Sequence, residues 1–224
     1  GCSSRAIHEA EAVVAQADSL WQAGLMYGID AGDSLTLAQA YKTLGDIPLP
    51  FREGLGLGSP YAHSCYHYGK LLRAKDHPAE AMQAFINATH SRTRDYHILG
   101  RVYSNMGDLC HLAGDFQLSY DMFEKSANCF LADNDSLSYY FLLNDMAFEK
   151  AMLADKESCI GLLHNIEQHC IDRGVICKTL ETKAELYLKC NQYDSVLYYA
   201  NENFSITENN ASALLIAQAY NYIG

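Results

Sequence analysis

Hydrophobic residues recur along most of this chain at intervals of three and four, the spacing of an α-helix with one buried face. From residue 61 onward the pattern predicts helices of 13–20 residues separated by short polar breaks. An earlier series predicts a first helix over about 5–26, followed by a second helix that ends at Gly45. Runs of Val and Ile are few, which favours helix over strand. We therefore expect an all-α fold.

One combination of residues recurs along these helices: a small residue, followed by small, bulky and small residues 12, 16 and 19 positions later. Four such sets occur at displacements of 38, 40 and 37 residues, and the last two sets are degraded. They are Gly69, Ala81, Phe85 and Ala88; Gly107, Ser119, Phe123 and Ala127; Ala147, Cys159, Leu163 and Ile166; and Ala184, Val196, Ala200 and Asn203. This period indicates stacked helix pairs, because one pair alone cannot bury its apolar face.

The repeats predict a right-handed α-α superhelix, a solenoid of antiparallel helix pairs. Residues 1–58 are expected to form an atypical terminal pair with a connector, packed on repeats that occupy residues 59–224. The repeats span about 62–98, 100–138, 140–175 and 177–208, with a partial repeat over 211–224. Gly224 lies 40 residues beyond Ala184, where the next small residue is due. The last segment is thus either a capping helix or, as we favour, the start of a repeat that continues.

The spacing resembles that of the tetratricopeptide repeat family, over about residues 60–205. The resemblance is carried by Tyr68-Gly69 with Ala81, Phe85 and Ala88, and by Tyr103 to Gly107 with Gly114-Asp115-Phe116, Phe123 and Ala127. Units of 37–40 residues are longer than the usual length of about 34. The resemblance implies a protein-interaction scaffold in which the first helix of each pair lines a concave groove.

We expect the groove to be lined by side chains of the first helices that lie one helical face away from the packing positions. They are His63, Tyr66, Lys70, Arg73, Arg101, Asn105, Asp108, Asn144, Phe148, Lys178, Glu181 and Glu185. The early repeats contribute basic and aromatic groups and the later repeats contribute acidic groups. An extended peptide or a protein segment is the partner that such a groove fits.

The net charge of −11 over 224 residues makes a nucleic-acid partner improbable. Residues 1–112 hold 9 basic and 11 acidic side chains (net −2), whereas residues 113–224 hold 7 and 16 (net −9). Eight cysteines show no C-x-x-C spacing, so a disulfide framework is not expected, and Cys170 with Cys177 is the one pair worth testing. No apolar run is long enough to span a membrane.

The first residues, Gly1-Cys2-Ser3-Ser4, resemble the processed end of a bacterial lipoprotein, in which Cys2 carries the lipid. The alternative is that Gly1 is a remnant of cloning and Cys2 an ordinary thiol. With a lipid on Cys2, the chain is expected in the bacterial cell envelope, facing the periplasm or the cell surface. Membrane contact is then expected through the lipid anchor alone.

The sequence contains no set of reactive groups at the spacing of a catalytic or metal site. His63 and His67 lie four residues apart with Cys65 between them, but a zinc site needs three or four ligands at distinctive spacing. Residues 54–58 (Gly-Leu-Gly-Leu-Gly) have no preceding strand and no following Lys-Ser/Thr, so they do not indicate a phosphate-binding loop. We expect no catalytic residues, no metal and no cofactor.

The Asp-Ser-(Leu/Val) triplet occurs four times, at residues 18–20, 33–35, 135–137 and 194–196. It fits helix N-caps and also resembles an acceptor motif for O-glycosylation of exported bacterial proteins. Together these features resemble lipid-anchored tetratricopeptide lipoproteins of Gram-negative gut bacteria. The function expected is a non-enzymatic scaffold that binds a protein or peptide. Two alternatives stay open: the extracytoplasmic sensor portion of a membrane-bound transcriptional regulator, and a glycan-capture lipoprotein.

Overall fold

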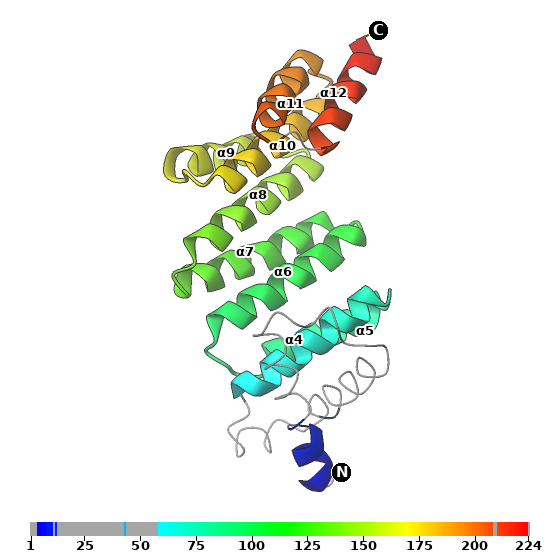
Figure 1. Ribbon diagram of the computed structural model, residues 1–224, viewed down its shortest axis with the longest axis vertical. Helices are drawn as coiled ribbons and strands as arrows, with labels where there is room; N and C mark the ends of the chain where they lie inside the picture. Colours follow the sequence, from blue (N-terminus) through cyan, green and yellow to red (C-terminus); the bar gives the residue numbers. More distant parts are fainter. Residues whose placement is uncertain (1–3, 11, 13–42, 44–57, 208–209, 224) are drawn as a thin grey trace. The chain divides into compact units, whose positions relative to one another are not determined.

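The structure is a computed structural model that describes residues 4–10, 12, 43, 58–207 and 210–223. Within these ranges the chain forms helices joined by turns and contains no strand (Figure 1). The helices are α4 (Gly58–Ala74), α5 (Pro78–Thr89), α6 (Tyr96–Leu112), α7 (Phe116–Ala132), α8 (Ser136–Met152), α9 (Lys156–His169), α10 (Arg173–Lys189), α11 (Tyr193–Thr207) and α12 (Asn210–Ile223). The all-α fold is confirmed.

Contacts between Cα atoms divide the chain into two compact units, Gly1–Leu109 (unit 1) and Cys110–Gly224 (unit 2). In unit 1, α4 packs against α5. In unit 2, each helix packs against the next along the chain, as Figure 1 shows for α7 with α8 and α10 with α11. In addition α8 packs against α10, so the first helices of successive pairs are neighbours. This is the stacking of an α-helical solenoid.

The small and bulky positions that define the repeat all lie in the core. Each of the sixteen residues in the four sets is buried. In unit 1, a Cβ atom built on Gly69 lies 2.5 Å from Cε1 of Phe85, so only glycine allows this approach of α4 to α5. In unit 2, Phe123, Ala147 and Leu163 belong to one hydrophobic cluster built from four helices. The residue types therefore recur because the same helix crossing recurs.

The turn inside each helix pair repeats with the same period. One residue in each of these turns has a positive φ: Asp76 (60°), Gly114 (80°), Ala154 (60°) and Asn191 (57°). These residues are separated by 38, 40 and 37 positions, which are the displacements of the packing residues. A residue in the left-handed conformation at the end of a helix lets the backbone N–H groups that follow donate hydrogen bonds to the last carbonyl groups of the helix. For example, Asp115 N–H donates to Cys110 O at 3.0 Å.

Aspartate side chains cap four helices of unit 2, two inside the pairs (α7 and α9) and two at the start of a pair (α8 and α10). Asp115, Asp135, Asp155 and Asp172 each accept a hydrogen bond from the backbone N–H three residues later, at 3.0–3.2 Å. Asp135 belongs to the third Asp-Ser triplet, and capping is confirmed there. In the fourth triplet Asp194 lies inside the first turn of α11 and is not its cap. The first two triplets lie outside the described residues.

The end of the chain differs from the expected register. In α12 the small residue that packs against Ala184, Val196 and Ala200 is Ala219, 35 residues after Ala184. This displacement is shorter than the 37–40 residues of the earlier sets, although α12 begins 37 residues after α10, the same distance that separates α10 from α8. Gly224 itself lies outside the described residues.

Other expectations fall partly or wholly outside the described residues. Residues 4–10 and 12 are helical, in line with a first helix near the N-terminus, but the rest of the predicted terminal pair is outside, as is Cys2. Cys170 and Cys177 are both buried free thiols. No described helix is long and apolar enough to span a lipid bilayer.

Candidate functional site

In unit 1, the predicted groove residues of α4 and α6 contact one another through hydrogen bonds. Arg73 Nη1 donates to Asn105 Oδ1 at 2.9 Å and to Asp108 Oδ2 at 2.7 Å. At the other end of α4, His63 Nε2 lies 2.9 Å from Oδ2 of Asp95, the residue before α6. Arg73, Asn105 and Asp108 therefore lie together, and His63 lies beside Asp95, a residue that the sequence had not singled out. These bonds fix the side chains at the two ends of the surface.

The middle of the same surface carries Lys70 and Arg101, both exposed. They lie near His67, whose pKa is lowered to about 4 by burial and by the positive charges of His63, Lys70 and Arg101. The imidazole of His67 is thus neutral at pH 7. The sequence indicated His67 only as one of two possible zinc ligands, together with His63. Its ring contacts that of Tyr66, with centroids 5.2 Å apart.

Two of the predicted groove residues are buried. Tyr66 is 6% exposed and its ring lies beside that of Phe85, with a centroid distance of 6.4 Å. Asn144 is fully buried, and its Nδ2 donates to Tyr140 O at 3.4 Å. Their burial leaves almost no side-chain surface for a ligand, because both point between helices. The predicted groove face of each first helix therefore includes positions that neighbouring helices cover. Only part of that face is exposed.

In unit 2, Phe148 and Glu185 line one cleft of about 330 Å³. The cleft lies between α8, α10 and α12, the first helices of three successive pairs. Its remaining walls come from Leu188, Lys189, Leu214, Leu215 and Gln218. Leu214 is 59% exposed, a high value for a leucine side chain. The cleft combines an apolar lining with an acid, an amine and an amide, a combination typical of ligand-binding sites.

Glu185 is the acid among the residues that line this cleft. Burial raises its pKa, and the negative charge of Glu181 adds to this effect. The charges of Lys178, Lys189 and His111 act in the opposite direction without cancelling it. Lys178, Glu181 and Glu185, all predicted groove residues, therefore lie close enough to interact on one face of α10. A cation brought to Glu185 would favour its ionised form.

Most of the cleft residues were missed by sequence reasoning. The groove prediction stopped at Glu185 and named no residue of the last repeat. With Ala219 as the packing residue, Leu214 and Gln218 fall on a first helix that faces α10. The sequence of α12 is apolar and contains no charged residue, and this feature could have indicated an apolar surface there.

A buried acid lies close to the cleft in unit 2. Glu149 has a side chain only 2% exposed, and its Oε1 lies 2.7 Å from Nδ1 of His111. The ring of His111 also contacts that of Phe148, with centroids 5.5 Å apart. The pair orients an aromatic wall of the cleft. Neither residue was singled out from the sequence.

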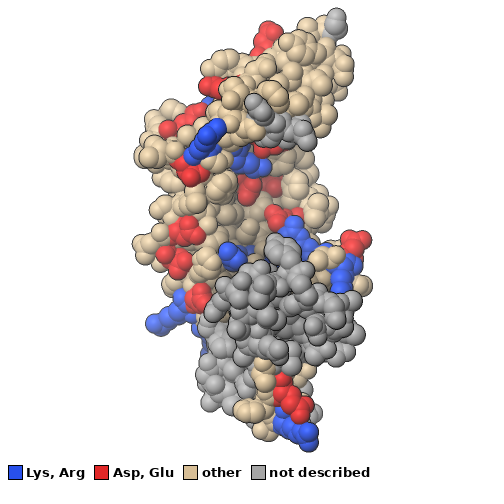
Figure 2. All heavy atoms as spheres, in the orientation of Figure 1, with Lys and Arg blue, Asp and Glu red and all other residues tan. Residues whose placement is uncertain are grey.

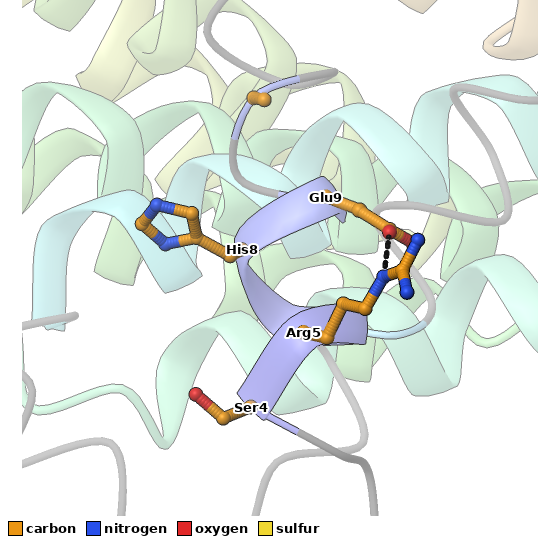
Figure 3. A pocket seen from close by; sticks show the side chains of 5 residues that line it. Ser4, Arg5, His8 and Glu9 are labelled. Atoms are coloured by element: carbon orange, nitrogen blue, oxygen red, sulfur yellow. Dashed lines mark hydrogen bonds and ion pairs between the residues drawn. The ribbon is translucent and has the colours of Figure 1, made fainter.

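A second hollow lies beside the N-terminal helix (Figure 3) and is lined by Ser4, Arg5, His8, Glu9 and Ala12. Arg5 pairs with Glu9 at 2.8 Å, and Figure 3 shows His8 on the other side of the helix. The side chains do not converge, so this hollow is not a candidate site. In the described part of the chain, no group of three His, Cys, Asp or Glu residues is placed to hold a metal ion.

Charge is dispersed over the described part of the face that Figure 2 draws. Figure 2 shows acidic and basic side chains scattered among a larger area of uncharged residues. Basic residues form no broad surface on the described part of that face. Long polyanions bind to continuous basic surfaces, and the described residues of this face present none.

No family model and no curated protein matches the sequence. Among 37 solved chains that match is BtubC (BKLC) from P. vanneervenii, with a TM-score of 0.62 over 86% of this chain and 82% of that chain. The chain has a helical-repeat fold. The sequence identity to BtubC is 12%, so the similarity concerns the fold alone. Function must be argued from the surface of the helical repeats.

Proposed function

We propose that this chain is a non-enzymatic interaction module of tetratricopeptide type that binds an extended peptide or protein segment on its first helices. The observation that carries the proposal is the cleft of unit 2, where Phe148, Leu188 and Leu214 form an apolar wall. A continuous apolar wall with a few charged groups is the surface that a peptide side chain fills. The repeat period and the sixteen buried packing positions support the family assignment.

The chemistry of the cleft specifies the peptide. An apolar side chain, such as leucine or phenylalanine, occupies the space between Phe148 and Leu214. A lysine or arginine beside it pairs with Glu185, whose burial makes an unpaired negative charge unfavourable. We therefore expect ligands in which a large apolar residue lies next to a basic residue.

Selection from a display library of random peptides tests the proposal. The full chain is immobilised, selected peptides are sequenced, and the affinity of one selected peptide is measured by fluorescence anisotropy. Leu214→Asp places a charge in the cleft and is expected to weaken binding by at least about tenfold, or 1.4 kcal/mol. The matched control is Leu118→Asp on α7, which alters a leucine that is 42% exposed and lies outside the cleft.

Two results would contradict the proposal. One is a selection in which no peptide is enriched over the background. The other is equal loss of affinity in the Leu214 and Leu118 variants, which would place the peptide elsewhere. Both leucines are exposed, so thermal unfolding of the two variants should match that of the unmodified chain within a few degrees, about 0.5 kcal/mol or less.

The proposal extends to the location of the protein. Cys2 is the lipid-bearing residue, and the module is held in the bacterial cell envelope by that lipid. Mass spectrometry of the native protein is expected to find diacylglycerol on Cys2. An unmodified thiol in the envelope fraction would remove the anchor from the proposal without affecting peptide binding.

A further inference from the structure

The contact between α11 and α12 follows one antiparallel register (Figure 1). The ring of Tyr193, at the start of α11, stacks on that of Tyr222, near the end of α12, with centroids 5.2 Å apart. Further along the contact, Ala200 of α11 and Leu215 of α12 belong to one hydrophobic cluster. A step of seven residues forward along α11 is thus matched by a step of seven residues back along α12.

This register places two buried polar residues opposite each other. Asn203 lies three residues after Ala200, and Ser212 lies three residues before Leu215. Asn203 has no exposed surface, and Ser212 is only 1% exposed. Neither Oδ1 nor Nδ2 of Asn203 has a hydrogen-bond partner within the described part of the chain. The contact between α11 and α12 therefore buries an amide that has given up its hydrogen bonds to water.

The earlier repeats carry an apolar residue at the position of Asn203. The last member of the first three repeat sets is Ala88, Ala127 and Ile166, and each of them is buried. Burial of an amide without hydrogen-bond partners is unfavourable, whereas an apolar side chain pays no such penalty. The penalty applies while α12 covers Asn203, because water reaches the amide once α12 has moved away. Asn203 therefore weakens the docking of α12.

The helices before α12 are joined by charged side chains that α12 lacks. Lys183 of α10 pairs with Glu167 of α9, and Arg173 of α10 donates a hydrogen bond to the carbonyl oxygen of Ile206 in α11. The sequence of α12 contains no charged residue, so its side chains form no ion pair with α10 or α11. Apolar contacts and the stacked tyrosine pair hold α12 in place.

We propose that α12 is a lid of the cleft in unit 2, which docks and undocks as one helix, and that the buried amide of Asn203 keeps the docked form only slightly favoured. The inference rests on the peptide cleft proposed above, to which α12 contributes Leu214, Leu215 and Gln218. When α12 undocks, the cleft loses this wall. A peptide that contacts the wall binds the docked form, so it shifts the equilibrium towards the docked lid.

Hydrogen exchange of the full chain, followed by mass spectrometry, tests the lid without a ligand. We expect the amides of α12 to exchange at least about tenfold faster than those of α10, because undocking exposes them without unfolding the earlier pairs. Asn203→Leu keeps the branched shape of the side chain and removes both polar atoms, so it is expected to slow the exchange of α12 by at least about tenfold. Asn203→Ala should act in the same direction.

The matched control is Asn201→Leu, the same substitution at an exposed position of α11. It should change the exchange of α12 by less than about twofold. Exchange of α12 as slow as that of α10 overturns the proposal. Unchanged or faster exchange of α12 in both Asn203 variants also overturns it, since faster exchange would show that the amide stabilises the docked helix.

A peptide selected as described above tests the coupling of the lid to the cleft. At ten times its Kd, a peptide that binds only the docked form should slow the exchange of α12 about tenfold, because the docked form is favoured by the factor 1 + [L]/Kd. A peptide that binds without slowing this exchange overturns the lid. Failure to select any peptide contradicts the proposed function instead, and the Asn203 variants then decide the docking of α12 in the free chain.

Discussion

The contact between Gly69 and Phe85 gives a sharp test of the repeat register. A Cβ atom at position 69 would lie 2.5, 2.8 and 2.9 Å from three carbons of the Phe85 ring. Cβ atoms essentially never approach other heavy atoms below 3.0 Å. Phe85 has no exposed surface, so its ring cannot swing into solvent. Gly69→Ala must therefore push α4 away from α5 or strain the ring.

The size of the effect follows from two opposing contributions. Overpacking a well-packed core costs about 1–3 kcal/mol. Replacing a glycine inside a helix by alanine recovers about 1 kcal/mol of helix propensity. We therefore expect Gly69→Ala to lower the free energy of unfolding by about 0–2 kcal/mol, the difference of these two contributions.

Gly161 provides the matched control. It lies inside α9, and a Cβ atom built there meets nothing within 4 Å. Gly161→Ala should gain the helix propensity without the clash, raising the free energy of unfolding by about 0.5–1 kcal/mol. The two variants should then differ by about 1–3 kcal/mol, the overpacking cost alone. For a chain of this size that corresponds to about 2–4 °C in Tm for each kcal/mol.

Urea unfolding followed by far-ultraviolet circular dichroism measures these differences. A third variant, Phe85→Leu, is combined with Gly69→Ala, because a smaller side chain makes room for the added methyl group. The double-mutant cycle is expected to give a favourable coupling of about 0.5–3 kcal/mol. If Gly69→Ala stabilises the chain as much as Gly161→Ala does, the close helix crossing at Gly69 is wrong.

Three further predictions concern polar groups. His111→Ala should lower the free energy of unfolding by about 1.5–3 kcal/mol in urea unfolding, because Glu149 loses a charge-assisted hydrogen bond inside the core. Asp135→Ala should cost about 0.5–2 kcal/mol through loss of the α8 cap. In the same assay Asp194→Ala, which removes no cap, should cost about 0.5 kcal/mol or less. Glu185→Gln should stabilise the chain at pH 7. The pKa of Glu185 is higher in the folded chain than its ordinary value of 4.5, so the free energy of unfolding falls as the pH rises above 4.5. Glutamine does not ionise, so the variant does not show this loss. Below pH 4.5 the advantage should vanish, which thermal unfolding at two pH values checks.

The sequence was most informative where one packing geometry repeats. Gly69, Ala81 and Phe85 form a triplet that only a close helix crossing explains, and the same spacing located the core of three later pairs. Small and bulky residues at fixed offsets report on packing directly, because a core has no tolerance for altered volume. The helix pairs could therefore be predicted from the sequence pattern alone.

The surface was less predictable, for physical reasons that particular residues illustrate. Tyr66 and Asn144 occupy positions next to the packing face, and whether such positions are exposed depends on the crossing angle of neighbouring helices. The hydrogen bond between His111 and Glu149 joins residues 38 positions apart, and no local pattern distinguishes these two side chains from solvated ones. The cleft at Leu214 was missed because it forms only where the three first helices α8, α10 and α12 meet, and no local pattern indicates that meeting.

The central claim is that a ligand lies on the first helices, in the cleft lined by Phe148 and Leu214. Photo-crosslinking tests it most directly: a selected peptide carrying a photoreactive group beside its apolar residue is irradiated with the full chain, and the adducts are mapped by mass spectrometry. We predict adducts on α8, α10 and α12, at residues that line the cleft, and their loss in the Leu214→Asp variant. Adducts confined to the second helices α7, α9 and α11 would contradict the account.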